Sequence, residues 1–169
     1  MKIASILLLS LCLLTPLVAQ NMEPPEALDD EMMNWLVGEW EGSYVSPMGT
    51  SKDWMKYEYG LDKQFLFIQG TSETAAMNYK GMGAMTIDSQ GNVVGDWIDN
   101  LRGRYNGKGT KAGNVVTLEW DGTSGKSTRI TEKLDENKLR VAVKMPGPDG
   151  TMMEYTGEFT RKPMMTEKN

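Results

Sequence analysis

From Gly38 onward, apolar and polar side chains alternate along the chain, and this period of two limits the fold more than any other feature. Trp40 and Tyr44 alternate with Glu41 and Ser43, and the pattern recurs in later segments: residues 55–59, 116–120, 129–134, 139–145 and 153–159. Successive side chains of a strand point to opposite faces of a sheet, so alternation places one face on a core and the other in water. We therefore predict an all-β fold.

The sequence does not say which face of any predicted strand points inward, and segment 129–134 is one example. One face carries Ile130, Glu132 and Leu134, and the other carries Arg129, Thr131 and Lys133. Alternation separates two faces of a strand but does not by itself assign either of them to the core.

Short polar segments rich in Gly, Asn and Asp separate the predicted strands, at residues 88–92, 121–122, 135–137 and 146–150. Short links between strands predict an antiparallel up-and-down meander. Closure into a barrel removes the exposed sheet edges, whereas an open sheet or a sandwich is the alternative. Because no internal repeat or linker is present, we expect a single domain over residues 20–162, followed by a flexible tail at 163–169.

The N-terminal residues have the layout of a secretory signal peptide. Lys2 precedes an apolar run at residues 6–14, and Ala19 offers a small residue at the cleavage position. We predict a signal peptide at 1–19 and export to the periplasm or beyond the cell. The run is short for a bilayer of about 30 Å, so we expect no stable membrane span after its removal.

Cys12 lies within this leader and is the chain's one cysteine. Lipid attachment to Cys12 is an alternative, but it requires a small preceding residue, and that residue is Leu11. Removal of the leader leaves a chain without disulfides, thiolate nucleophiles or cysteine metal ligands.

Residues 24–37 are the one helical candidate. Pro24 or Pro25 suits a first turn, and acidic residues follow where a helix N-terminus favours them. The apolar residues Leu28, Met32, Trp35 and Leu36 are spaced along one helical face. We expect a short amphipathic helix that packs against the sheet.

Residues 36–42 read Leu-Val-Gly-Glu-Trp-Glu-Gly, and they link this helix to the first strand. The segment resembles the Gly-x-Trp opening of the lipocalin superfamily. Segments 79–83, 95–99 and 155–161 add a resemblance, in order and spacing, to a bacterial lipocalin-like family of unknown function. The resemblance covers roughly residues 35–162.

The resemblance implies a calycin-type antiparallel barrel of about eight to ten strands with a helix at one end. In lipocalins the tryptophan of the opening motif packs beneath the barrel floor, covered by an arginine from the last strand. Gly38, Trp40 and Arg161 match these positions, so we expect structural roles for them. The resemblance implies no reaction, and the other lipocalin signatures are absent from this sequence.

Composition excludes several classes of function. The chain has no histidine, which removes the commonest general base, the commonest metal ligand and the usual axial ligand of haem. We expect no metal site, no catalytic residues and no cofactor. The net charge of −5 is spread without basic blocks, so we expect no nucleic-acid partner.

The densest polar segment spans residues 96–104. On an extended strand Trp97 and Asp99 share one face, and Arg102 and Arg104 would continue the opposite face. The alternative is that Asn100 and Leu101 form the turn of a hairpin. One interpretation places a carboxylate and arginines at a barrel mouth, where guanidinium groups orient an anionic or polar ligand. The alternative is ion pairing on the solvent face.

Methionine is abundant, and aromatic residues are spread through most predicted strands. Thioethers adapt to varied apolar guests but equally fill ordinary cores. Our hypothesis is an exported barrel that binds a small apolar or amphipathic molecule. The ligand-binding residues that we predict are Tyr57, Met85, Trp97, Asp99, Arg102, Arg104 and Tyr155. The alternatives are a filled barrel that docks a partner through its outer surface, and an enzyme that works without histidine.

Overall fold

The computed structural model describes residues 25–46, 49–147 and 149–163. The predicted signal peptide and Cys12 lie outside these residues, as does the predicted tail beyond residue 163. The described elements are α1 (Glu31–Leu36), β1 (Gly38–Ser46), β2 (Gly49–Thr50), β3 (Lys52–Gly60), β4 (Phe65–Glu73), β5 (Asn78–Ile87), β6 (Val93–Asp99), β7 (Arg104–Ala112), β8 (Val115–Gly122), β9 (Gly125–Asp135), β10 (Lys138–Pro146) and β11 (Met152–Arg161).

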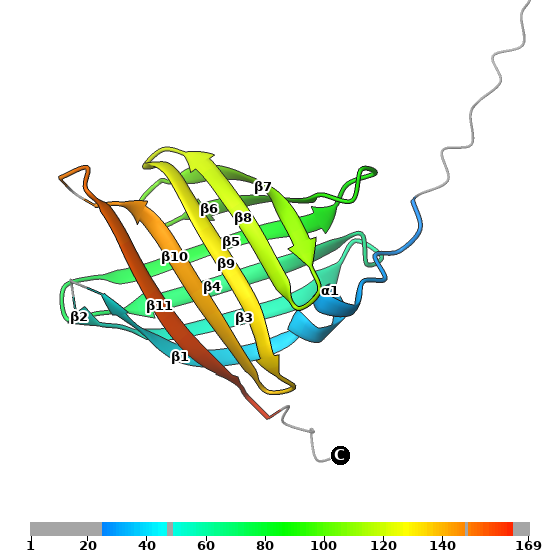
Figure 1. The fold of residues 1–169 in the computed structure, drawn as a ribbon, viewed down its shortest axis with the longest axis horizontal. Helices are drawn as coiled ribbons and strands as arrows, with labels where there is room; N and C mark the ends of the chain where they lie inside the picture. Colours follow the sequence, from blue (N-terminus) through cyan, green and yellow to red (C-terminus); the bar gives the residue numbers. More distant parts are fainter. Residues whose placement is uncertain (1–24, 47–48, 148, 164–169) are drawn as a thin grey trace, which may run out of the picture.

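The strands form one antiparallel sheet that closes on itself (Figure 1). From β3 to β11 each strand pairs with the next one in sequence, and β3 also pairs with β1. The two-residue β2 pairs with β1 alone and lies beside the ring. Pairing of β1 with β11, from Trp40↔Arg161 to Val45↔Thr156, completes the closure. The predicted up-and-down barrel is therefore confirmed, with ten strands in the ring.

Helix α1 covers one end of the barrel, and the two-residue β2 lies at the opposite end (Figure 1). The links at residues 61–64, 88–92, 113–114 and 136–137 lie at the helix end, and those at 74–77, 100–103 and 123–124 lie at the far end. The helix end is tightly packed. Met33, Leu36, Trp40, Leu139 and Phe159 are each at most 1% exposed.

The helix is shorter than predicted, and the predicted start at Pro24 is wrong. Asp30 has extended backbone angles, and its carboxylate accepts a hydrogen bond from the backbone N–H of Met33 at 3.1 Å, which makes it the N-cap. Residues before it bond elsewhere, since the N–H of Leu28 donates to the carbonyl of Lys63 at 2.9 Å. A backbone hydrogen bond to the link between β3 and β4 therefore replaces the first predicted turns.

On β9 the large apolar side chains face outward and the more polar ones face inward. Thr131 is 6% exposed and points inward, whereas Ile130 and Leu134 are 38% and 36% exposed. The register explains this. Thr131 pairs with the buried Val116 on β8 and the buried Val141 on β10, and residues paired across antiparallel strands share a face.

Within the described residues, we find no helix of the length and apolar character that a bilayer crossing requires.

Candidate functional site

A cavity of about 390 Å³ occupies the barrel interior. It extends from Leu36 of α1 to residues of the strand links at the opposite end, including Thr74, Leu101 and Ser124. Its wall is mostly apolar and aromatic: Trp54, Met55, Tyr57, Ile68, Met77, Tyr79, Met85, Trp97, Tyr105, Leu118, Trp120, Val143, Met145 and Tyr155 are among the lining residues. A volume of this size lies within the range of about 300–1,000 Å³ that is typical of small-molecule sites.

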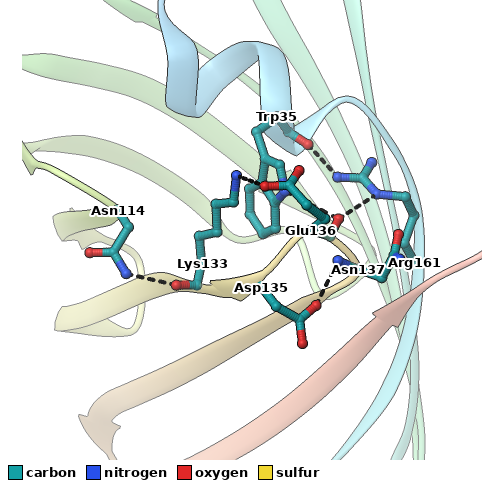
Figure 2. Close-up of polar contacts among 7 residues, drawn as sticks. All are labelled: Trp35, Asn114, Lys133, Asp135, Glu136, Asn137 and Arg161. Carbon is teal, nitrogen blue, oxygen red and sulfur yellow. Dashed lines mark hydrogen bonds and ion pairs between the residues drawn. The ribbon is translucent and has the colours of Figure 1, made fainter.

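The floor below this cavity is held by Arg161, the last residue of β11. Its Nη1 and Nη2 atoms donate to the carbonyls of Val37 and Trp35, each at 2.6 Å, and Nε donates to the carbonyl of Glu136 at 3.3 Å. Figure 2 shows this guanidinium between the end of α1 and the β9–β10 turn. It also lies 4.1 Å from the ring centroid of the fully buried Trp40. The contacts fix the helix to the closing strand.

Arg129 is a charged side chain inside the barrel. It lies on the inward face of β9, paired with Leu118 and Val143. Its Nη1 donates to the hydroxyl of Tyr44 at 3.4 Å, and its Nη2 approaches the sulfur of Met55 at 3.0 Å. Among the described residues, no carboxylate forms an ion pair with it.

Arg129 remains cationic in spite of its surroundings. Burial alone would lower its pKa, but the neighbouring phenols Tyr44 and Tyr57 outweigh this effect and leave the pKa of Arg129 above its ordinary value. The same burial raises the pKa of Tyr44 to about 12, although the positive charge of Arg129 opposes the rise. Burial likewise raises the pKa of Tyr155, which keeps its hydroxyl protonated. The interior therefore presents one fixed cation among neutral hydroxyl groups.

Asp53 is the second charged group in this part of the interior. It is 4% exposed, and its Oδ2 accepts hydrogen bonds from the Ser51 hydroxyl and from the backbone N–H of Tyr44 at 3.3 Å. The carboxylate thus ties β1 to the start of β3. Its contacts are structural, but it also borders the cavity.

The predicted site residues separate into two groups. Tyr57, Met85, Trp97, Asp99 and Tyr155 all line the cavity, whereas Arg102 and Arg104 are exposed and do not. The structure therefore does not bring these two arginines to the cavity.

The segment 99–103 forms the turn that we considered as the alternative. The Oδ1 of Asp99 accepts from the backbone N–H groups of Leu101 and Gly103 at 2.9 and 2.8 Å, and Arg102 has a positive φ of 64°. On the adjoining strand, the indole N–H of Trp97 donates to the hydroxyl of Tyr79 at 2.6 Å. These contacts fix the rim of the cavity.

Sequence reasoning missed Arg129 because β9 carries its large apolar residues outward. The sequence did contain a signal that could have revealed Arg129. The two segments that flank β9, 116–120 and 139–145, each carry one face that is apolar throughout. Once these are placed on either side of β9, the register forces Arg129 and Thr131 inward.

Within the residues that the structure describes, no group of three or more acidic side chains is positioned to hold a metal ion.

The closed antiparallel ring, the helix at one end and the interior cavity define a lipocalin-like β-barrel. Rv2717c from M. tuberculosis has this fold with a TM-score of 0.60 and 15% identity, over 79% of this chain and 99% of that one. The S-type phycobiliprotein lyase CPES from Guillardia theta gives a TM-score of 0.60 at 8% identity, over 79% and 92% of the two chains. A de novo designed fluorescence-activating β-barrel is similar at a TM-score of 0.48 and 15% identity, over 79% of this chain and 100% of the design. At such identities the similarity to Rv2717c and to the lyase shows the fold alone, and the weaker likeness to the design carries no argument.

No family model matches the sequence, and no curated protein matches it.

Proposed function

We propose that this protein is an exported binding protein that holds a small apolar or amphipathic molecule inside its barrel. The observation that supports the proposal is the cavity of about 390 Å³, with its apolar and aromatic wall and a few polar groups. A wall of this kind, with a small number of placed polar groups, is characteristic of ligand sites. Export rests on the predicted signal peptide at residues 1–19, and membership of the bacterial lipocalin-like family rests on the resemblance of residues 35–162.

The alternative of a filled barrel is less consistent with this interior. A filled core would leave the inward side chains of β6, β8 and β9 in mutual contact, whereas Trp97, Trp120 and Arg129 border a common cavity. An outer surface for a partner would require an apolar patch. The strand pair Met82↔Ile98 offers one small candidate, with the two side chains 50% and 49% exposed.

The test is a thermal-shift screen with fatty acids, lysophospholipids and quinone analogues. A ligand present at about a hundred times its Kd stabilises the folded state by roughly 2.7 kcal/mol, which raises the Tm of a chain this size by about 5–10 °C.

Two tryptophan substitutions on adjacent positions of β9 supply the control. Ser127→Trp adds a large ring to the cavity wall opposite Trp120, whereas Lys126→Trp adds the same ring on the exposed face. We expect the ligand-induced shift to disappear in the first variant and to persist in the second. The proposal fails if no compound raises the Tm, or if both variants respond as the native protein does.

A further inference from the structure

The position of Arg129 divides the barrel interior into two levels. Towards the helix, the cavity wall is formed by Tyr57, Met85, Val116 and Phe159, which are at most 3% exposed and belong to the hydrophobic core. Towards the far end of the barrel, which is the open end opposite α1, Trp97, Trp120 and Met145 border the cavity. Arg129 lies four residues from the start of β9, or about 13 Å along the strand from the far end of the barrel.

The hydrogen bonds of Arg129 go to neutral groups. They join the guanidinium to the hydroxyls of Tyr44 and Tyr57 and to the sulfur of Met55, and a thioether accepts weakly. A cation enclosed without a carboxylate partner is costly to fold around. The other arginines in the described residues lie on the outer surface or at the floor of the barrel. Arg140 pairs with the carboxylates of Glu132 and Glu158, and Arg161 donates to backbone carbonyls.

The surroundings of Arg129 restrict the charge that a partner can carry. Asp53 borders the same cavity and contributes a negative charge near Tyr44, which Arg129 contacts. A group with one charge and two oxygens matches the guanidinium fork and is neutralised by it, whereas a second negative charge would be desolvated in the cavity without a cation to offset it. The neutral hydroxyls of Tyr44 and Tyr155 offer further donors at this level.

We propose that Arg129 binds the carboxylate of a monoanionic amphipathic ligand, whose apolar part lies towards the open end among Trp97, Trp120 and Met145. This inference rests on the proposed function and specifies its ligand class. The carboxylate enters first and stops at Arg129, because Arg129 is the one cation among the described residues that line the cavity and the wall beyond it, towards the helix, is mostly apolar. The carboxylate of the ligand thus supplies the ion-pair partner that Arg129 lacks among the described residues.

The test uses two pairs of probes that differ in their head group: decanoate with 1-decanol, and 2-naphthoate with 2-naphthalenemethanol. Binding to the protein is measured by isothermal titration calorimetry. We expect each carboxylate to bind roughly 10- to 100-fold more tightly than its alcohol, the range expected for hydrogen bonds to a buried charged group. Decyl phosphate should bind more weakly than decanoate, and tighter binding of the phosphate would overturn the monocarboxylate assignment.

Arg129→Met removes the charge and keeps an unbranched side chain, and Arg104→Met makes the same change on the exposed face of β7. We expect the preference for carboxylate over alcohol to fall to near unity in the Arg129 variant and to stay at the native value in the Arg104 variant. The Tm of Arg129→Met should equal or exceed that of the native protein, which shows that the variant is folded.

The outcomes separate this inference from the proposed function. Equal binding of acid and alcohol to the native protein, or an unchanged preference in Arg129→Met, overturns the role of Arg129 and leaves a ligand-binding barrel. Absence of binding by all four probes overturns both.

Discussion

Replacement of Arg161 by alanine tests whether the floor of the barrel depends on one guanidinium. Arg161→Ala removes the two 2.6 Å hydrogen bonds to the carbonyls of Val37 and Trp35 and uncovers the ring of Trp40. These carbonyls lie at the C-terminal end of α1, where a helix has no internal donors left to satisfy them.

The magnitude follows from these contacts. Hydrogen bonds to a charged group contribute about 1.5 kcal/mol each at the low end, which suits a partly exposed arginine, and its position over Trp40 adds about 0.5 kcal/mol. We count nothing for the longer bond to Glu136. The expected loss is about 3.5 kcal/mol of the free energy of unfolding, a large part of the 5–15 kcal/mol that is typical of a domain. The Tm should fall by roughly 7–14 °C.

The assay is urea unfolding followed by tryptophan fluorescence, because Trp35 and Trp40 both lie at this floor. The matched control is Arg140→Ala. Arg140 is on the outer surface, paired with Glu132 and Glu158 at 3.4 and 3.2 Å, and exposed pairs contribute less than about 1 kcal/mol. The reasoning is refuted if Arg161→Ala costs no more than Arg140→Ala.

Two further predictions concern backbone packing and pH. Gly109→Ala should lower the free energy of unfolding by about 1–3 kcal/mol, since the added Cβ would overlap the backbone carbonyl of Thr117. Gly70→Ala is the control, because the nearest atom there is 3.4 Å away, and similar losses in urea unfolding of both variants would contradict the packing argument. Burial raises the pKa of Tyr44 from 10.0 to about 12 in the folded protein, so its contribution to stability is complete below pH 10 and is lost as the pH rises towards 12. Unfolding measured across this window should show a loss of up to about 3 kcal/mol that is smaller in Tyr44→Phe, and identical pH dependence of the two proteins would contradict the prediction.

The class of fold was predictable from the sequence because it depends on a local pattern. Alternation in segments such as 40–44 and 116–120 is a property of each segment alone, and the polar links between them are equally local. The contact of Arg161 with Trp40 was expected from the resemblance. The helix was predicted too long, because the bond between Leu28 and Lys63 depends on two segments far apart in the chain.

The candidate site was predictable only in part, for a related reason. Tyr57, Met85 and Tyr155 belong to segments whose apolar face is obvious, and they line the cavity. The arginines at 102 and 104 stood out in the sequence because they are close together. Arg102 lies in the exposed turn at 99–103, and Arg104 pairs with the outward-facing Ile98.

The sequence by itself determined that this chain would form strands with two distinct faces, linked by short turns. Only the tertiary structure decided that Arg129 would face inward, because its direction is set by the inward Leu118 and Val143 on either side of it. Pairing register is a collective property of neighbouring strands, and in a closed ring every strand is held between two others. A strand with weak preference for either face therefore takes the orientation that its neighbours impose, and in this protein that orientation places a cation beside the cavity.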